Sequence, residues 1–244
     1  MLAELLGRAD VPGLLAGLPQ RPINFDPADM ERADPAQGWR TTNLCQRLEP
    51  EPPGEPLADG SWEIARALMR GYEFADPSIV RAHYDPDVPL RGRNMVLDLQ
   101  ALGLFHLFVG VRVHDVYECD RDERRARVWG WAYRTLQGHV EMGQMDWEVW
   151  KWRDTGEVEF RVHAVSRTAQ ITNPLVRVGF HLVRGHEREL FLTSTCERMR
   201  QLTALALKRG AEPVRDAAAE LTARPSSSSD AAHDQLAQSL RDRR

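Results

Sequence analysis

Residues 128–168, with the sequence VWGWAYRTLQGHVEMGQMDWEVWKWRDTGEVEFRVHAVSRT, decide the fold of this chain. Three runs of strand-like composition, 128–136, 144–152 and 157–168, are joined by two turn-like connections, 137–143 and 153–156. Aromatic and β-branched residues favour extended structure, and connections this short join only antiparallel neighbours. The stretch therefore predicts an antiparallel meander.

The meander extends upstream. Residues 94–102 and 105–118 are both strand-like, and the second shows apolar residues at every other position from Leu107 to Val113. A further strand is predicted at 39–48.

Three segments between the first strand and the meander are predicted to be irregular or helical. The proline-rich run 49–56, EPEPPGEP, indicates a linker or surface loop. A helix follows at 61–71 with Ser61 as its N-cap, and the pair Asp76-Pro77 predicts the start of a second short helix over SIVRAHY.

After residue 173 the apolar period changes from two to helical. Asn173-Pro174 supplies a cap and a first-turn proline, and apolar residues then recur at helical spacing to about residue 209. A sheet with one apolar face must cover it, and this helix is the only element long enough to do so. We therefore predict an α+β fold in which a curved antiparallel sheet grips a long C-terminal α-helix, the helix-grip arrangement. Sheet curvature leaves space beside the helix, which predicts a pocket.

Composition bounds the remaining organisation. The chain has 244 residues and a net charge of −4 with no concentrated basic face, so nucleic acid is not an expected partner. No segment has the length of a membrane span, and the N-terminus lacks the basic leading region of a secretion signal. Three scattered cysteines favour a reducing compartment, so we predict a cytoplasmic protein.

The domain boundaries predicted are an N-terminal extension 1–38, the helix-grip domain 39–210 and a flexible low-complexity tail 211–244. The sequence predicts nothing about oligomeric state.

A polar knot lies between the first two strands of the meander: Tyr133-Arg134-Thr135-Leu136-x-Gly138-His139-x-Glu141-x-Gly143. With Ser166-Arg167 and the helix at Pro174, it resembles the signature of DUF1990, a family of unknown function. The resemblance covers about residues 60–200 and implies a fold like the START/Bet v 1 (SRPBCC) group, whose members commonly hold hydrophobic ligands. It implies no activity.

Three positions depart from that family pattern: Arg134 replaces a glycine, Gln144 a glutamate and Thr168 a proline. The change at Gln144 removes a carboxylate on which an acid–base mechanism would otherwise draw.

Several interpretations of the polar knot stay open. The pair His139 and Glu141 suits a metal, general acid–base chemistry, or hydrogen bonding within the turn. Two residues do not make a metal site, so we expect no metal and no cofactor. Ser166 faces inward and is either a pocket donor or a bonded core serine, and His163 on the opposite face is badly placed to make it a nucleophile.

The predicted ligand-binding residues combine an aromatic strand face with this polar rim and one position of the helix: Trp131, Tyr133, Thr135, His139, Glu141, Ser166 and Leu182. The leading hypothesis is a pocket protein for a small apolar or amphipathic molecule. The alternatives are a cyclase- or hydrolase-like enzyme that uses His139 or Glu141 with Tyr133, and an interaction module that binds a partner through residues 1–60 or the tail.

Overall fold

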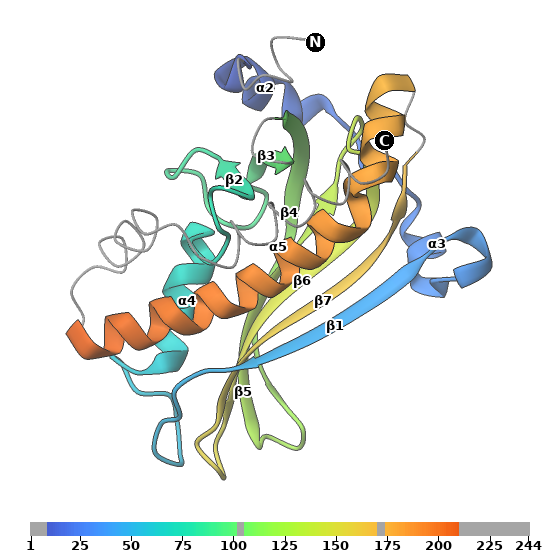
Figure 1. Ribbon diagram of the computed structural model, residues 1–244. Coiled ribbons are helices and arrows are strands. Elements are labelled where there is room, and N and C mark those ends of the chain that lie inside the picture. The colour runs from blue at the N-terminus through green and yellow to red at the C-terminus, as the bar shows by residue number, and fades with distance from the viewer. Residues whose placement is uncertain (1–8, 102–104, 170–173, 210–244) are drawn as a thin grey trace, which may run out of the picture.

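The computed structural model describes residues 9–101, 105–169 and 174–209, with side chains from 9–100, 106–169 and 188–209. Its helical elements are α2 (Val11–Gly17), η1 (Leu18–Gln20), α3 (Pro27–Arg32), η2 (Pro35–Gln37), α4 (Ser61–Gly71) and α5 (Pro174–Arg209). The strands are β1 (Arg40–Arg47), β2 (Val80–His83), β3 (Asn94–Ala101), β4 (Phe105–Arg121), β5 (Ala126–Thr135), β6 (Glu141–Trp152) and β7 (Val158–Thr168) (Figure 1).

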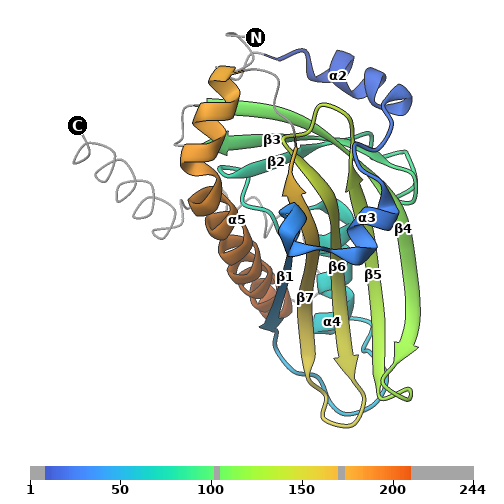
Figure 2. The same cartoon turned by 90° about the vertical axis from the view of Figure 1, so that its right-hand side faces the viewer.

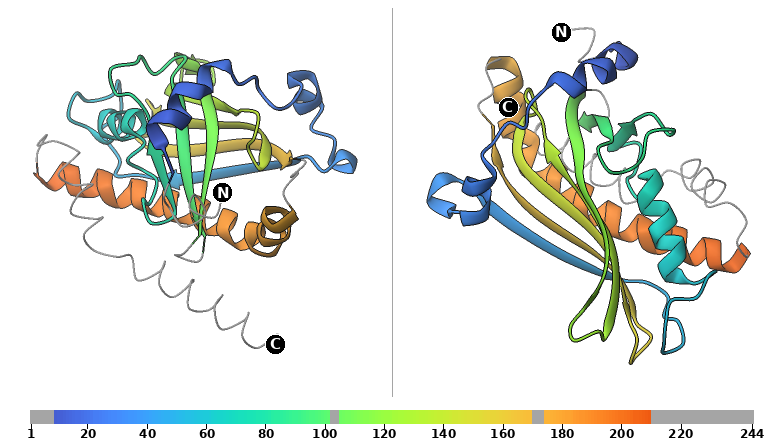
Figure 3. Two further views of the ribbon diagram at one scale, coloured as in Figure 1. Left: turned by 90° about the horizontal axis from the view of Figure 1, so that it is seen from above. Right: turned by 180° about the vertical axis from the view of Figure 1, so that it is seen from behind.

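The seven strands form one antiparallel sheet in the order β1-β7-β6-β5-β4-β3-β2. From β2 to β7 each strand pairs with its neighbour in sequence, and β1 closes the order beside β7 (Figure 2). The sheet curves, and α5 runs obliquely across its inner face (Figure 3). The predicted meander, the single long helix and the helix-grip fold class are confirmed.

The helix predicted after Asp76-Pro77 is wrong. Asp76 caps one turn only, in which its carboxylate accepts from the Ser78 amide at 2.9 Å and its carbonyl from the Val80 amide at 2.8 Å. The chain then extends as β2, which pairs with β3 from Val80↔Leu99 to His83↔Val96. The start signal was present, but β-branched residues and a partner strand favoured extended backbone.

Ser61 is not the N-cap of α4, because Gly60 occupies that position. The cap comes from elsewhere in the chain: the Glu51 carboxylate accepts from the Trp62 amide at 2.9 Å and from the Leu57 amide at 3.1 Å. A carboxylate at a helix N-terminus satisfies orphan donors and complements the helix dipole.

The proline-rich segment that contains Glu51 is therefore anchored to the domain. Lys151 of β6 is fully buried, and its amine donates to the Pro52 carbonyl at 2.7 Å and to the Gly156 carbonyl at 3.2 Å. The same amine lies 3.7 Å from the Glu51 carboxylate. This buried pair holds the segment against the β6–β7 turn.

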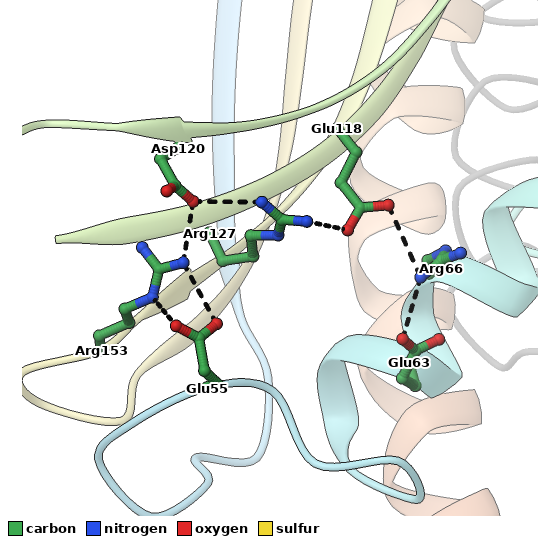
Figure 4. A network of polar contacts seen from close by, with 7 residues as sticks. All are labelled: Glu55, Glu63, Arg66, Glu118, Asp120, Arg127 and Arg153. Atoms are coloured by element: carbon green, nitrogen blue, oxygen red, sulfur yellow. Dashed lines mark hydrogen bonds and ion pairs between the residues drawn. The ribbon is translucent and has the colours of Figure 1, made fainter. Parts of the chain in front are cut away.

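A surface ion network continues from this segment toward α4. Glu55 pairs with Arg153, whose guanidinium also reaches Asp120, and the chain of alternating charges runs on through neighbouring side chains to α4 (Figure 4). Its further members are Arg127, Glu118, Arg66 and Glu63. Exposed pairs each contribute about 0–1 kcal/mol, so the network orients the hairpin ends rather than holding the fold.

The core lies between the inner sheet face and the two main helices. Alternate residues of β5, β6 and β7 point inward, where they pack with α4 and with Leu192, Met199 and Leu202 of α5. Residues 11–24 pack on the opposite face: Leu18 is buried at 1% exposure against Val96 and Leu136, at the space left by Gly110. The predicted boundaries of 1–38 and 211–244 stay predictions, and residues 211–244 lie outside the described residues.

In the part of the chain that the structure describes, no helix is both long enough and apolar enough to cross a membrane.

Candidate functional site

The polar knot forms the connection between β5 and β6, and Thr135 ties it together. The Thr135 hydroxyl accepts from the Gly143 amide at 2.9 Å and lies 2.7 Å from the Asn24 side-chain oxygen, to which it donates. The Asn24 amide nitrogen donates to the Glu141 carbonyl at 3.0 Å. Thr135 and Asn24 thus fix the turn from the N-terminal side, and a ligand contact for Thr135 stays a prediction.

His139 folds back on the same turn. Its Nδ1 accepts from the Glu141 amide at 2.9 Å, which requires that this nitrogen be unprotonated. Although the imidazole is only partly shielded from solvent, desolvation lowers its pKa to about 4. Of the three interpretations of the pair, this contact favours hydrogen bonding within the turn.

The lowered pKa makes a pH-dependent contribution to stability. Between pH 4 and 6.5 the unfolded chain binds the His139 proton more readily, so the free energy of unfolding should rise with pH across this window. The contribution is complete above the unfolded pKa and is lost as pH falls toward 4. Since the ring keeps some solvent contact, we expect about 1–2 kcal/mol.

Urea unfolding at pH 4.5 and pH 7 measures this contribution. His139→Asn should lessen the difference in stability between the two pH values, whereas His163→Asn, at an exposed histidine, should retain it. An unchanged pH dependence in His139→Asn would show that the His139 pKa is not lowered.

The centre of the polar cluster is Arg188 of α5, which no sequence pattern distinguishes. Its guanidinium donates to the Glu141 carboxylate and to the Ser166 hydroxyl, both at 3.1 Å, and to the Thr42 hydroxyl at 3.2 Å. One side chain of the helix therefore joins β1, β7 and the start of β6. Glu141 and Ser166 of the predicted site are brought together through it.

Tyr133 lies at the inner edge of this cluster. Its hydroxyl donates to the Met145 sulfur at 3.3 Å. Burial raises its pKa well above 10, while Tyr72 and Arg188 act in the opposite direction and Glu141 adds to the rise. The hydroxyl is therefore protonated at neutral pH and available as a donor.

An aromatic cluster continues inward from Tyr133. Trp131, Trp147 and Tyr72, the C-cap residue of α4, form a triangle with ring centroids 6.1–6.4 Å apart. Phe191 of α5 packs edge-on against Trp147 at 6.3 Å. Trp131 is 1% exposed, so this predicted site residue belongs to the packed interior.

Three donors of the triangle have no hydrogen-bond partner among the described residues: Trp131 Nε1, Trp147 Nε1 and the Tyr72 hydroxyl. The Tyr72 hydroxyl lies near that of Tyr133 but makes no hydrogen bond of acceptable geometry, and burial is the main cause that raises its pKa well above 10.

Two further predictions about the site concern Leu182 and a metal ion. Leu182 belongs to α5, but its side chain lies outside the described residues, and its place in the site stays a prediction. Among the residues with described side chains, no group of three or more His, Cys, Asp or Glu is placed to hold a metal ion.

The knot, Ser166 and the start of α5 fall within one match to a family model. The model is "Domain of unknown function (DUF1990)", and it matches residues 26–188. The chain belongs to the DUF1990 family. That match ends at Arg188, so the DUF1990 region contains each residue of the polar cluster. No curated protein matches the chain.

Solved structures that resemble this DUF1990 protein are remote in sequence. Norcoclaurine synthase of Thalictrum flavum is 11% identical, with 68% of this chain and 96% of that chain covered and a TM-score of 0.40. Ara h 8.0201 is 10% identical, with 66% and 98% covered and a TM-score of 0.37. Major latex-like protein 151 of Panax ginseng is 9% identical, with 66% and 95% covered and a TM-score of 0.36.

Proposed function

We propose that this protein binds a small apolar or amphipathic molecule between the sheet and α5, against the aromatic cluster of Tyr72, Trp131, Tyr133 and Trp147. The observation that carries the proposal is the set of three unpartnered donors in that cluster. The proposal includes a cytoplasmic location, which the three free thiols of the chain favour.

Buried donors are rarely left without an acceptor. More than nine in ten buried polar groups are paired, and an unpaired one costs about 1–3 kcal/mol. Three within one triangle of rings is therefore a large local cost. A molecule with an apolar body and one or two acceptor oxygens would relieve this cost, and tryptophan and tyrosine supply such a mixed surface in ligand sites.

The polar cluster provides the outer end of the proposed site. Arg188, Glu141 and Ser166 form a hydrogen-bonded group beside Tyr133, which an amphipathic ligand would meet with its polar end. The Glu141 carboxylate is already paired with Arg188, and the His139 Nδ1 is occupied by a backbone amide. These contacts favour a binding role over the acid–base chemistry that an enzyme would require of the same two residues.

Tyr72→Phe tests the proposal because it removes a buried hydroxyl that has no hydrogen-bond partner of acceptable geometry among the described residues. We expect a melting temperature equal to or slightly above that of the parent, since burying a hydroxyl without a partner is unfavourable. Uptake of N-phenyl-1-naphthylamine, an uncharged apolar fluorophore, and the yield of any co-purified molecule in native mass spectrometry should both change.

The matched control is Tyr84→Phe. The Tyr84 hydroxyl donates to the Gly71 carbonyl at 2.8 Å, so its removal should cost about 1 kcal/mol of stability and leave probe uptake unaltered. Equal probe uptake in the parent and in Tyr72→Phe, with no co-purified molecule in either, would contradict a ligand at this cluster.

A further inference from the structure

The outer face of the sheet, turned away from α5, carries an open groove of about 730 Å³. It is lined from β1, β7, β6 and β4 by side chains that alternate with the core residues, among them Asn43, His163, Asp146 and Tyr117. No part of the proposed interior site contributes to it.

Strand register brings the residues that line this groove together. Two adjacent rows cross the sheet: Tyr117, Gly130, Glu148, Arg161 and Cys45 in one, and Asp115, Ala132, Asp146, His163 and Asn43 in the other. In both rows the β5 position is small, a glycine or an alanine. The Tyr117 ring lies over the Gly130 position, and side chains of β4, β6, β7 and β1 line the groove.

In the first row each charged side chain has a partner of opposite charge. Tyr117 lies across Gly130, where a Cβ atom would be 2.8 Å from its ring, and its hydroxyl donates to Glu148 at 2.6 Å. Glu148 also accepts from Trp150 Nε1 at 2.7 Å, and Arg161 pairs with Glu159 at 2.6 Å. This row forms an ordered wall with its charges already matched.

In the second row one of the two carboxylates has no such partner among the described residues. Asp115 pairs with Arg91 at 2.8 Å, but Asp146 forms no ion pair with any residue whose side chain the structure describes. Among the described residues, its carboxylate accepts only from the Gln144 amide, at 3.0 and 3.2 Å, although Arg121 and Arg161 line the same groove and Arg134 lies near it. Each of these has another partner: Arg134 donates to Gln144, Arg161 pairs with Glu159 and Arg121 with Glu148.

His163 lies directly across from Asp146 in the register, and its Nδ1 is 2.6 Å from the Asn43 side-chain oxygen. In this contact Nδ1 is the donor, since the Asn43 oxygen can only accept. Asp146 thus offers an acceptor on one side of the groove, and burial raises its pKa although Gln144, His163 and Arg134 act in the opposite direction.

We propose that this outer groove is a second ligand site that binds a small organic cation, with the ligand's protonated primary amine held by Asp146 and its carbon body lying in the groove between Tyr117 and His163. An ammonium has donors only, so it matches a carboxylate that lacks a cation. A body of several carbon atoms suits a groove whose lining includes Leu44, Val162 and the Tyr117 ring.

The probe for this site is phenethylamine, with 2-phenylethanol as the uncharged analogue of the same shape. Isothermal titration of the full chain should show binding of the amine and none of the alcohol at the same concentrations. Asp146→Asn keeps the Gln144 contact and removes the charge, so the affinity for phenethylamine should fall about ten- to a hundredfold.

Two controls keep the result interpretable. Asp154→Asn makes the same charge change in the exposed β6–β7 turn and should leave the affinity unchanged. Because burial of Asp146 without an ion pair among the described residues is unfavourable, Asp146→Asn should retain or raise the melting temperature, which separates loss of binding from loss of fold. N-phenyl-1-naphthylamine uptake at the interior cluster should be the same in Asp146→Asn and the parent.

Three outcomes would overturn the second site. They are no binding of phenethylamine by the parent, equal binding by Asp146→Asn, and equal binding of the alcohol. The interior site fails separately, when Tyr72→Phe does not alter naphthylamine uptake.

Discussion

Lys151→Met should lower the free energy of unfolding by about 3–5 kcal/mol, because it leaves a buried carboxylate without its cation. The Lys151 amine is 3.7 Å from the Glu51 carboxylate, whose side chain is only 3% exposed. The Pro52 and Gly156 carbonyls would lose their donor in the same change. Methionine has nearly the same length, so the loss would come from charge and hydrogen bonds rather than from a cavity.

The chain offers a matched control for this variant, since Lys208 is its only other lysine. Lys208 is exposed in the last turn of α5, and Lys208→Met should change stability by less than about 0.5 kcal/mol. Urea unfolding at pH 7 measures both. A Lys151→Met variant within about 1 kcal/mol of the parent would show that the pair is not buried in solution.

The double variant Glu51→Gln, Lys151→Met separates the pair from the packing around it. Removing both charges avoids an isolated buried ion, so the double variant should recover part of the stability lost by Lys151→Met. The amide oxygen that Glu51→Gln introduces can still accept from the Trp62 amide and so retain the cap of α4.

Glu51 has two structural roles that the local sequence pattern did not predict. Four prolines within 49–56 correctly indicated an irregular backbone, but not that Glu51 would be buried as the cap of α4 and the partner of Lys151. Both roles depend on residues 11 and 100 positions away, and no local period encodes such contacts. The strands that pair with their neighbours in sequence were predictable, because the short connections between them are a local feature of the sequence.

The sequence indicated that the polar residues of the site lie close together, but not which side chain joins them to α5. Tyr133, Glu141 and Ser166 stood out by composition and by the family pattern, whereas Arg188 lies among several arginines of the helix with nothing local to distinguish it. Its role follows only from where α5 crosses the sheet. The outer groove was similarly hidden, since Gly130 and Ala132 acquire meaning only when strand register sets them between Tyr117, Asp115, Glu148 and Asp146.

The β2 segment shows a conflict between two local signals. Asp76-Pro77 begins a turn with good capping contacts, and the same chemistry begins many helices. The residues after it are few, and a free edge of β3 was available to pair with them. In this segment the local preferences for helix and strand were about equal, and pairing with β3 favoured the strand.

Gly143→Ala should destabilise the protein by about 3 kcal/mol or more, because both its backbone conformation and its surroundings exclude a side chain. Gly143 has a φ of +151°, and a Cβ atom there would lie 2.1 Å from the Val165 carbonyl oxygen and 2.7 Å from the Ser166 Cα. These neighbours are backbone atoms of the paired strand, which cannot move without breaking the β6–β7 ladder at Gly143↔Ser166.

Two other glycines separate the causes. Gly38 has a φ of +83° with nothing within 4 Å of a Cβ, so Gly38→Ala should carry only the conformational cost of about 1–2 kcal/mol. Gly17, at the end of α2, has open space and an ordinary φ, so Gly17→Ala should be neutral or stabilising. A Gly143→Ala variant no worse than Gly38→Ala would refute the steric argument.

The same change reports on the candidate site. Displacement of β7 at Ser166 would draw its hydroxyl away from Arg188, and the Thr135 contact to the Gly143 amide would loosen at the same time. The polar cluster would then be altered in the folded fraction as well. We therefore expect Gly143→Ala to change naphthylamine uptake per folded molecule, whereas Gly38→Ala should leave it as in the parent, because only the first glycine holds β6 against the strand that carries Ser166.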